Sequence, residues 1–365
     1  MTEREIKLMK GNEVIAHAAV RYGCDAYFGY PITPQSEVME TLMELKPWES
    51  TGMVVLQSES EVASANMLYG AAATGKRVLT SSSSPGVSLM SEAMSYMAGA
   101  ELPCVIVNCQ RGGPGLGTIQ PSQADYFQAC KGGGHGDFHL IVLAPNSVQE
   151  MHDHVAMAFD LAFKYRNPAM ILADGIIGQM MEKVTLAPQR PRRTREELRA
   201  ESDEWAARGN GGYRRSNVVT SLALQAPDME RVNQKLQAKY EAMQSEVLVE
   251  EIETDDAEYV IVAFGSSARI CAATVEMARE RGIKLGLVRP ITVYPFPYDT
   301  ITKLAQRGVK GFLSAELNSG QMVEDVRLAV NGAAPVAHYG RQGGMIFSPD
   351  EVLDALMARV ININK

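Results

Sequence analysis

The sequence predicts an α/β protein built around a mostly parallel β-sheet. From residue 11 to about residue 182, short apolar runs of strand length alternate with longer helical periods. Such alternation is typical of a parallel sheet with helices on both faces. The chain of 365 residues is long enough for two domains with buried cores, and its 46% hydrophobic and 21% charged content is that of a soluble globular protein.

The elements of this first region follow one another in a regular order. Strands are predicted over 26–28, 53–57, 77–81, 104–109, 140–143 and 169–173. Helices are predicted over 12–22, 35–45, 61–74, 86–100 and 148–165. Ligands of such sheets gather at the carboxyl ends of the strands, so functional residues are expected in the segments that follow them.

The chain changes character near residue 186, and we divide it into three parts. Residues 1–186 form the first domain, and residues 187–256 form a charged linker with a helical arm around 228–250. Residues 257–365 form a second, smaller α/β domain, with strands predicted at 258–264, 284–288, 311–315 and 336–339. The turn that follows the first of these strands lacks the full GxGxxG spacing and gives little support to a nucleotide site.

Composition argues against several classes of function. The formal net charge of −8 and the absence of a basic stripe argue against a nucleic-acid surface. No apolar run is long enough to span a membrane, and residues 1–5 lack the apolar core of a signal peptide, so a cytoplasmic protein is expected. The five cysteines are scattered without a CxxC pair, so any iron–sulfur cluster is expected on another chain.

The turn at 29–36 is the most informative local feature. Pro31 and Pro34 bracket Thr33 between a predicted strand and a predicted helix. The prolines restrict the backbone, which would hold the Thr33 hydroxyl and nearby N–H groups toward an anionic ligand at the positive end of the helix. The alternative is that Thr33 only caps this helix, with Pro34 as its first residue.

Glu61 begins the predicted helix 61–74, directly after a strand and near the edge of the sheet where ligands bind. A carboxylate at this position is often only a favourable partner of the helix dipole. A catalytic role is the alternative, and Glu59 competes with Glu61 for it.

Arg111 follows the strand 104–109 and precedes a run of glycines. Its planar guanidinium suits bidentate capture of a carboxylate, although an arginine at a strand end is more often a surface ion-pair partner. The serine-rich run that ends in Ser84 and Gly86 is either a turn with a helix cap or a wall of a cofactor site. His135 and Asp137, in a second glycine-rich loop, are either structural or within reach of a substrate or coenzyme A.

Four motifs, in this order, resemble the α subunits of the 2-oxoacid:ferredoxin oxidoreductases. They are Tyr-Pro-Ile-Thr-Pro at 30–34, Gln-Ser-Glu-Ser-Glu at 57–61, Ser-Ser-Ser-Ser-Pro-Gly at 81–86 and Asn-Cys-Gln-Arg-Gly-Gly-Pro at 108–114. Residues 115–137 resemble the branch of that family that acts on 2-ketoisovalerate, and the similarity returns at 316–322. The charged middle stretch has no recognisable match.

This resemblance implies a thiamin-diphosphate pyrimidine-binding-type domain followed by a smaller domain like the C-terminal domain of transketolase. It implies that Glu61 hydrogen-bonds the aminopyrimidine ring and promotes its imino tautomer, that Arg111 and Thr33 bind the 2-oxoacid, and that Pro31, Ser84 and Gly86 border the cofactor. The spacing from Glu61 to Gly70 matches the family pattern and favours Glu61 over Glu59 as the glutamate that contacts the cofactor.

The resemblance also implies an activity shared among several subunits. The assembled enzyme would convert a 2-oxoacid, coenzyme A and oxidised ferredoxin into acyl-CoA, CO₂ and reduced ferredoxin. Ala-Asp-Gly-Ile at 173–176 is a poor version of the Gly-Asp-Gly motif that holds Mg²⁺ and the diphosphate, so a β subunit is expected to supply that half. A γ subunit and a ferredoxin-like δ subunit with the iron–sulfur clusters complete the expected partners, and no metal ligand is assigned to this chain.

Three alternatives remain open from the sequence. The substrate could be 2-oxoglutarate in place of a branched-chain 2-oxoacid. The chain could belong to a thiamin enzyme that does not use ferredoxin, such as a transketolase-like or decarboxylating dehydrogenase component. It could also be a non-catalytic scaffold with a degenerate thiamin fold.

Overall fold

The computed structural model describes residues 5–362, so residues 1–4 and 363–365 of the two predicted domains lie outside it. The larger of its sheets has seven strands, which all run parallel except at one edge. In sheet order they are β12 (Thr292–Tyr294), β6 (Ile141–Leu143), β7 (Pro168–Asp174), β5 (Cys104–Gln110), β4 (Val78–Ser82), β2 (Ala26–Gly29) and β3 (Val54–Gln57).

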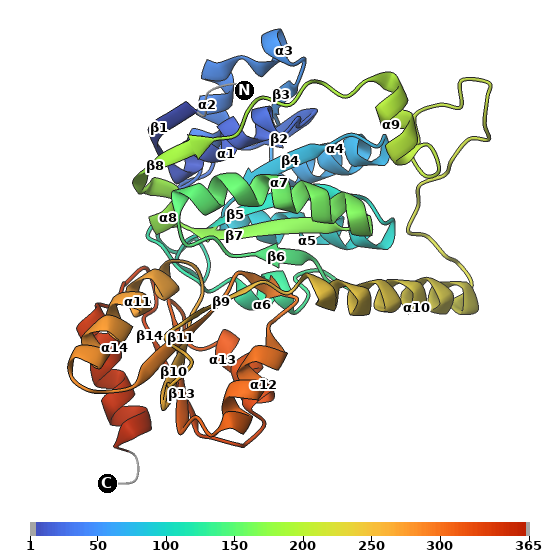
Figure 1. Ribbon diagram of the computed structural model, residues 1–365. Helices are drawn as coiled ribbons and strands as arrows, with labels where there is room; N and C mark the ends of the chain where they lie inside the picture. The colour runs from blue at the N-terminus through green and yellow to red at the C-terminus, as the bar shows by residue number, and fades with distance from the viewer. Residues whose placement is uncertain (1–4, 363–365) are drawn as a thin grey trace.

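Helices cover both faces of this sheet, as the alternating pattern predicts (Figure 1). They are α1 (Gly11–Arg21), α2 (Glu37–Leu45), α3 (Pro47–Ser50), α4 (Glu61–Ala73), α5 (Ser84–Gly99), α6 (Tyr126–Cys130), α7 (Val148–Tyr165) and α8 (Gly175–Gln179). Helices α1 and α7 pack against each other on one face, and α4 and α5 pack against each other on the opposite face. A two-stranded antiparallel ribbon of β1 (Glu5–Lys10) and β8 (Met181–Leu186) lies beside α1 and α7.

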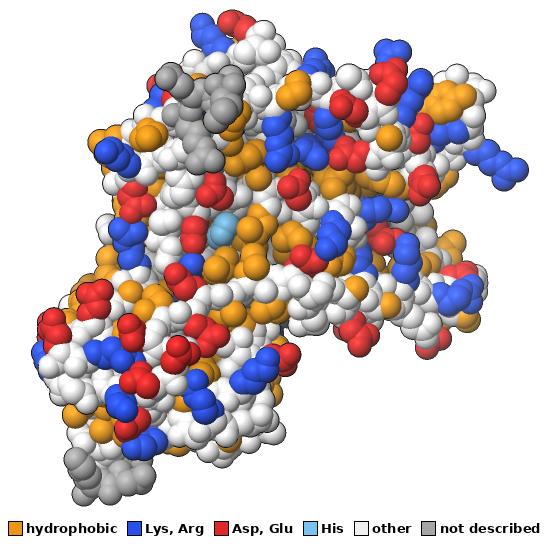
Figure 2. Space-filling model, in the orientation of Figure 1, with side chains coloured by type: hydrophobic (Ala, Val, Ile, Leu, Met, Phe, Trp, Pro, Cys, Tyr) orange, Lys and Arg blue, Asp and Glu red, His pale blue; other side chains and the backbone are white. Residues whose placement is uncertain are grey.

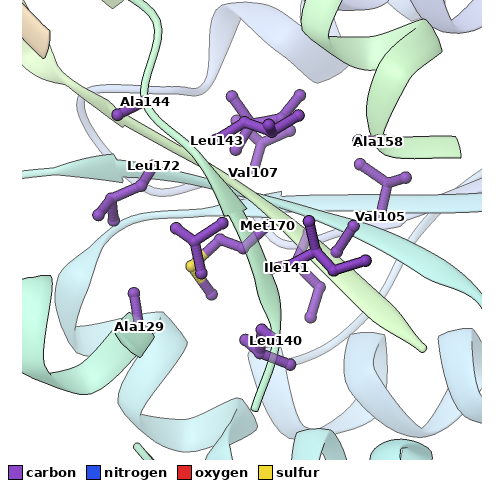
Figure 3. Close-up of a cluster of buried hydrophobic side chains, with 14 of the residues drawn as sticks. Val105, Val107, Ala129, Leu140, Ile141, Leu143, Ala144, Ala158, Met170 and Leu172 are labelled. Atoms are coloured by element: carbon purple, nitrogen blue, oxygen red, sulfur yellow. The ribbon is translucent and has the colours of Figure 1, made fainter. Parts of the chain in front are cut away.

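The central strands are buried on both faces, which explains why they read as continuous apolar runs. Every residue of β5 and of β7 is buried. Figure 3 shows Val105 and Val107 of β5 together with Met170 and Leu172 of β7 in this core. The outer surface is different: on the face drawn in Figure 2, lysine and arginine side chains are interspersed with aspartate and glutamate.

The segment between the two sheets contains more regular structure than the sequence indicates. Its elements are α9 (Arg195–Ser202), α10 (Ala226–Ala242), the 3₁₀ helix η1 (Met243–Glu246) and β9 (Val249–Ile252). The helix expected around 228–250 therefore ends early, because β9 pairs antiparallel with a strand of the second sheet. Figure 1 shows α9 and α10 at one side of the molecule, joined by a long connection.

The second sheet has five strands in the order β14 (Val336–Gly340), β13 (Gly311–Glu316), β10 (Tyr259–Val262), β11 (Leu285–Pro290) and β9. Its helices are α11 (Gly265–Glu280), α12 (Tyr298–Arg307), α13 (Met322–Val330) and α14 (Pro349–Leu356), which continues into the π-helical turn η2 (Met357–Ile361). The α/β fold class predicted for both parts of the chain is confirmed.

Buried polar contacts join the two sheets. After β11 the chain returns to the first sheet, where β12 pairs antiparallel with β6. Arg289 of β11 is 3% exposed and donates to both carboxylate oxygens of Glu150 in α7, at 2.9 and 2.8 Å, and to Glu250 of β9 at 2.6 Å. Charge-assisted bonds of this kind fix geometry as well as adding stability, so the two sheets are held in a defined orientation.

Candidate functional site

The predicted site residues gather at one edge of the larger sheet. Strands β2, β3, β4 and β5 run parallel, so their carboxyl ends meet there. In register, Gly29 lies beside Gln57, and Ser82 beside Asn108. The turn with Thr33, the start of α4, the start of α5 and the segment at Arg111 all follow these strand ends. The structure therefore brings together segments far apart in the sequence.

Glu61 is the first residue of α4, whose N-cap is Ser60, with its side chain accepting from the Ala63 N–H at 3.2 Å. The Glu61 side chain is buried, whereas that of Glu59 is exposed. Within residues 5–362 the Glu61 carboxylate makes no hydrogen bond or ion pair, although a buried carboxylate normally has a partner.

Gly86 lies directly against this carboxylate. A Cβ atom at position 86 would stand 2.7 Å from Glu61 Oε1 and would overlap with Ser82 Oγ. Glycine is therefore the residue that leaves room between these side chains. Gly86 belongs to the first turn of α5, which begins at Ser84, two residues earlier than the sequence predicts.

Arg111 lies next to the Thr33 turn. Its Nη1 donates to the Thr33 carbonyl at 3.0 Å and its Nη2 to the Leu116 carbonyl at 3.1 Å. The arginine is 8% exposed, and its Nε is buried without a hydrogen-bond partner in the described part of the chain. Both contacts are to neutral carbonyls, so the guanidinium has no carboxylate partner among residues 5–362.

The prediction that Thr33 could cap the next helix is wrong. Helix α2 begins at Glu37 and its N-cap position is Ser36. Thr33 and Pro31 are exposed, whereas Pro34 is buried and its carbonyl accepts from Asn12 Nδ2 at 2.6 Å. Buried contacts therefore fix the end of the turn and leave the Thr33 hydroxyl at the surface.

Ser84 connects α5 to the Arg111 segment. Its hydroxyl accepts from the Arg111 N–H at 3.1 Å and lies 2.5 Å from Asp125 Oδ2, to which it donates. Asn108 Nδ2 also donates to that oxygen, at 2.9 Å. Burial raises the pKa of the Asp125 carboxyl group, and the two hydrogen bonds oppose this rise. Reasoning from the sequence missed Asp125, because only the folded chain brings it beside Ser84.

A cavity of about 500 Å³ opens between the two sheets beside Arg111. Its lining comes from the first turn of α5, from the segments around 111–115 and 122–125, and from the segments 317–321 and 342–343 of the second part. Amide and hydroxyl groups dominate the polar part of this lining, including those of Ser84, Asn318, Gln321 and Gln342. The first turn of α5 thus lines this cavity through Ser84 and packs against the Glu61 side chain through Gly86.

His135 and Asp137 lie elsewhere. They line a different cavity, of about 400 Å³, between α5 and α10. The His135 carbonyl accepts from Ser95 Oγ at 2.5 Å, and its ring packs edge-on against Tyr96. The structure therefore does not bring these two residues to Arg111.

Asp174, the acidic residue of the 173–176 segment, is engaged in structural contacts. Its Oδ1 accepts from the N–H groups of Ile176 and Ile177 at the start of α8, and its Oδ2 accepts from Ser266 Oγ at 2.5 Å. Within residues 5–362, no group of three or more His, Cys, Asp or Glu side chains is arranged to hold a metal ion. In the same range, no helix combines the length and apolar character needed to cross a membrane.

The surroundings of Glu61 fit the aminopyrimidine end of a thiamin cofactor. A carboxylate without a partner within residues 5–362 is suited to hydrogen-bond a ring nitrogen, and the absence of a Cβ atom on Gly86 allows close packing beside it. The fully buried Ser82 hydroxyl, which also lacks a partner in the described residues, faces the same space. No comparable donor set for a diphosphate-bound metal is present within 5–362.

Two family models match most of the chain. Residues 17–254 match the family model "Pyruvate flavodoxin/ferredoxin oxidoreductase, thiamine diP-bdg", and residues 257–352 match "Pyruvate:ferredoxin oxidoreductase core domain II". The ketoisovalerate oxidoreductase subunit VorB of Methanothermobacter marburgensis is 48% identical over 95% of this chain and 96% of its own length. The 2-oxoglutarate synthase subunit KorA of Methanocaldococcus jannaschii is 35% identical over 97% of this chain and all of its own length (100%).

Solved structures share the fold. The 2-oxoglutarate:ferredoxin oxidoreductase of Magnetococcus marinus superposes with a TM-score of 0.84 at 24% identity, over 98% of this chain and 65% of the longer chain. An inactive split-gene transketolase tetramer gives 0.59 at 11% identity, over 96% and 97% of the two chains. The family resemblance drawn from the four motifs is confirmed, and this chain belongs to the family of 2-oxoacid:ferredoxin oxidoreductase α subunits.

Proposed function

We propose that this chain supplies the cofactor-activating and substrate-orienting residues of an oxidoreductase that decarboxylates a branched-chain 2-oxoacid. The products would be an acyl-CoA, CO₂ and reduced ferredoxin. The observation that carries the proposal is the Glu61 side chain, which is 7% exposed, has no hydrogen-bond or ion-pair partner within residues 5–362 and lies at the same sheet edge as the Arg111 guanidinium. The identity of 48% to a ketoisovalerate oxidoreductase subunit, against 35% to a 2-oxoglutarate synthase subunit, favours the branched-chain substrate.

Glu61 would bind the cofactor. When bound, thiamin diphosphate supplies the nucleophilic carbon and the electron sink that decarboxylation requires. Glu61 would hold a proton between its carboxyl group and the ring nitrogen, beside Gly86, whose lack of a Cβ atom allows the close approach. Pro31 and the first turn of α5, with Ser84 and Gly86, would border the ring.

Arg111 would orient the 2-oxoacid. Its contacts to the Thr33 and Leu116 carbonyls fix the guanidinium, and the buried Nε has no acceptor within residues 5–362. A carboxylate can accept two parallel bonds from such a fork. The exposed Thr33 hydroxyl lies in the turn that Arg111 holds, so it is within the same part of the site.

A partner subunit would complete the site from the side of α4 and α5. Helix α4 consists mainly of alanine and larger apolar residues and has no broad polar face, a composition typical of a helix that is covered on more than one side. The side chain of Val62, next to Glu61, is 46% exposed. Leu89 on α5 and Val54 and Leu56 on β3 are also exposed. We assign this apolar surface to a β subunit that carries Mg²⁺ and the diphosphate half of the site.

The remaining components follow from the same proposal. The iron–sulfur clusters would lie on partner subunits, including a γ subunit and a ferredoxin-like δ subunit, and would pass electrons to soluble ferredoxin. Coenzyme A would approach through the cavity between the sheets, whose amide-rich lining suits a chain that contains amide groups. In the division of the chain into 1–186, 187–256 and 257–365, the first part would bind the cofactor. The third part would form one wall of the cavity.

The complex reconstituted with its partner subunits should reduce a viologen dye when given 2-ketoisovalerate and coenzyme A. Its kcat/KM for 2-ketoisovalerate should exceed that for 2-oxoglutarate, because a distal carboxylate needs a second cation. Between residues 112 and 137 the candidate cations are Lys131 and His135. Lys131 is ion-paired with Asp325, and His135 lines the cavity between α5 and α10. Pyruvate should be disfavoured only modestly, since a methylene-sized difference contributes about 1–3 kcal/mol.

Comparing kcat/KM for the three 2-oxoacids tests the choice of substrate, whereas dye reduction tests the reaction class. A clear preference for 2-oxoglutarate would overturn the branched-chain assignment and leave the oxidoreductase class intact. Turnover of the 2-oxoacids without dye reduction would favour a thiamin enzyme that does not use ferredoxin.

Glu61→Gln should slow exchange of the cofactor C2 proton in the assembled complex by about 10²–10⁴-fold, the usual contribution of a positioned acid or base. The amide is nearly the same size as the carboxyl group, so assembly should be unchanged. Glu59→Gln is the matched control, because Glu59 is exposed two residues away, and it should exchange like the wild type. A slowing of less than about tenfold for Glu61→Gln would remove Glu61 from this role and favour the scaffold alternative.

Arg111→Ala should lower kcat/KM for the 2-oxoacid by an amount equivalent to about 2–5 kcal/mol, as for other desolvated charge pairs, while thiamin diphosphate binding stays nearly constant. Arg111→Lys keeps the charge but cannot reproduce the fork that contacts Thr33 and Leu116, so it should recover only part of the loss. Steady-state kinetics and calorimetry on the same preparations measure both quantities. An unchanged kcat/KM in Arg111→Ala would refute the assignment.

A further inference from the structure

The run Thr80–Ser84 at the end of β4 contains five consecutive hydroxyl side chains, and four of them have partners. Thr80 donates to the Phe28 carbonyl at 2.6 Å, Ser81 to Gln35 Oε1 at 2.5 Å, Ser83 to the Cys109 carbonyl at 2.8 Å, and Ser84 to Asp125. Ser82 Oγ is the exception: the residue is 0% exposed, and its hydroxyl has no hydrogen-bond partner within residues 5–362.

An unpaired hydroxyl in this position is costly. Burying such a group without a partner costs about 1–3 kcal/mol, and alanine at the same place would avoid that cost. The neighbouring hydroxyls fasten β4 to the surrounding strands and loops, whereas Ser82 contributes nothing of this kind in the described chain. A buried polar group left unsatisfied in this way requires an explanation.

Ser82 faces Glu61. A Cβ atom on Gly86 would overlap with Ser82 Oγ and would also lie 2.7 Å from Glu61 Oε1. The hydroxyl and the carboxylate oxygen therefore approach the same point from different elements, β4 and α4. Neither group has another partner within 5–362, and because Gly86 has no Cβ atom both groups can pack closely against it.

We propose that Ser82 is a positioning residue for Glu61: its hydroxyl donates a hydrogen bond to the Glu61 carboxylate in the assembled site and fixes the direction in which that carboxylate addresses the cofactor ring. This inference rests on the role given to Glu61 in the proposed function. A hydroxyl donor and a carboxylate acceptor are complementary, and both oxygens lie close to the position that a Cβ atom on Gly86 would take. Ser82 acts through Glu61 and does not itself contact the reacting atoms.

The test is a double-mutant cycle in the assembled complex, with Ser82→Ala, Glu61→Gln and the combined variant. Ser82→Ala alone should slow C2-proton exchange by about 10–100-fold, the size expected for a hydrogen bond to a charged group. In the Glu61→Gln background it should slow exchange by less than about twofold, because residues that act as one unit are not additive. Ser82→Thr, which keeps the hydroxyl, should recover most of the rate.

Two further readouts separate positioning from a structural role. In Ser82→Ala the dissociation constant of thiamin diphosphate, measured by calorimetry, should be nearly unchanged, and the unfolding midpoint of the purified chain should be equal to or higher than that of the wild type, because alanine removes an unpaired buried hydroxyl. Ser91→Ala is the matched control, since Ser91 is on α5 and its hydroxyl donates only to the Val87 carbonyl of its own helix. This variant should behave like the wild type in every assay.

Each outcome bears on a different claim. Wild-type exchange in Ser82→Ala, with strong slowing in Glu61→Gln, would overturn this inference and leave the proposed function standing. Fully additive losses would show that Ser82 acts independently of Glu61 and would also overturn the inference. Wild-type exchange in Glu61→Gln would instead contradict the proposed function.

Discussion

The first turn of α5 is the constraint on which both halves of the site depend. Ser84 ties that turn to the Arg111 backbone and to Asp125, and Gly86, two residues later, packs against Glu61. Because a helical turn is rigid, Arg111 and Glu61 are held at a fixed separation, as the roles proposed for them require. The parallel strands β2, β3, β4 and β5 bring the segments that follow them to one edge of the sheet. The first turn of α5 then sets the spacing between Arg111 and Glu61.

Much of this arrangement could be predicted from the sequence, because buried parallel strands leave a strong local pattern. The strand predicted at 104–109 is observed as β5, Cys104–Gln110, and the helix predicted at 148–165 is α7. The positions of Glu61 and Arg111 at a strand-to-helix junction and a strand end follow from the same periodicity, and their roles come from the four motifs.

What could not be predicted depends on contacts between distant segments. Strand β12 has three residues and exists because it pairs with β6, which lies about half the chain away. Strand β9 interrupts a helical pattern because it pairs with β11. The contacts of Ser84 with Asp125, and the absence of one for Ser82 within 5–362, are likewise tertiary, and no local pattern distinguishes Ser82 from its serine neighbours.

The central claim is that this chain holds one half of a shared thiamin diphosphate site. Calorimetric titration of thiamin diphosphate with Mg²⁺ into the purified chain, and then into the chain mixed with its β subunit, measures this directly. We expect no micromolar binding by the chain alone, because Glu61 and Gly86 would contact only the ring, and micromolar binding once the β subunit is added. Micromolar binding by the chain alone would show that the site is not shared.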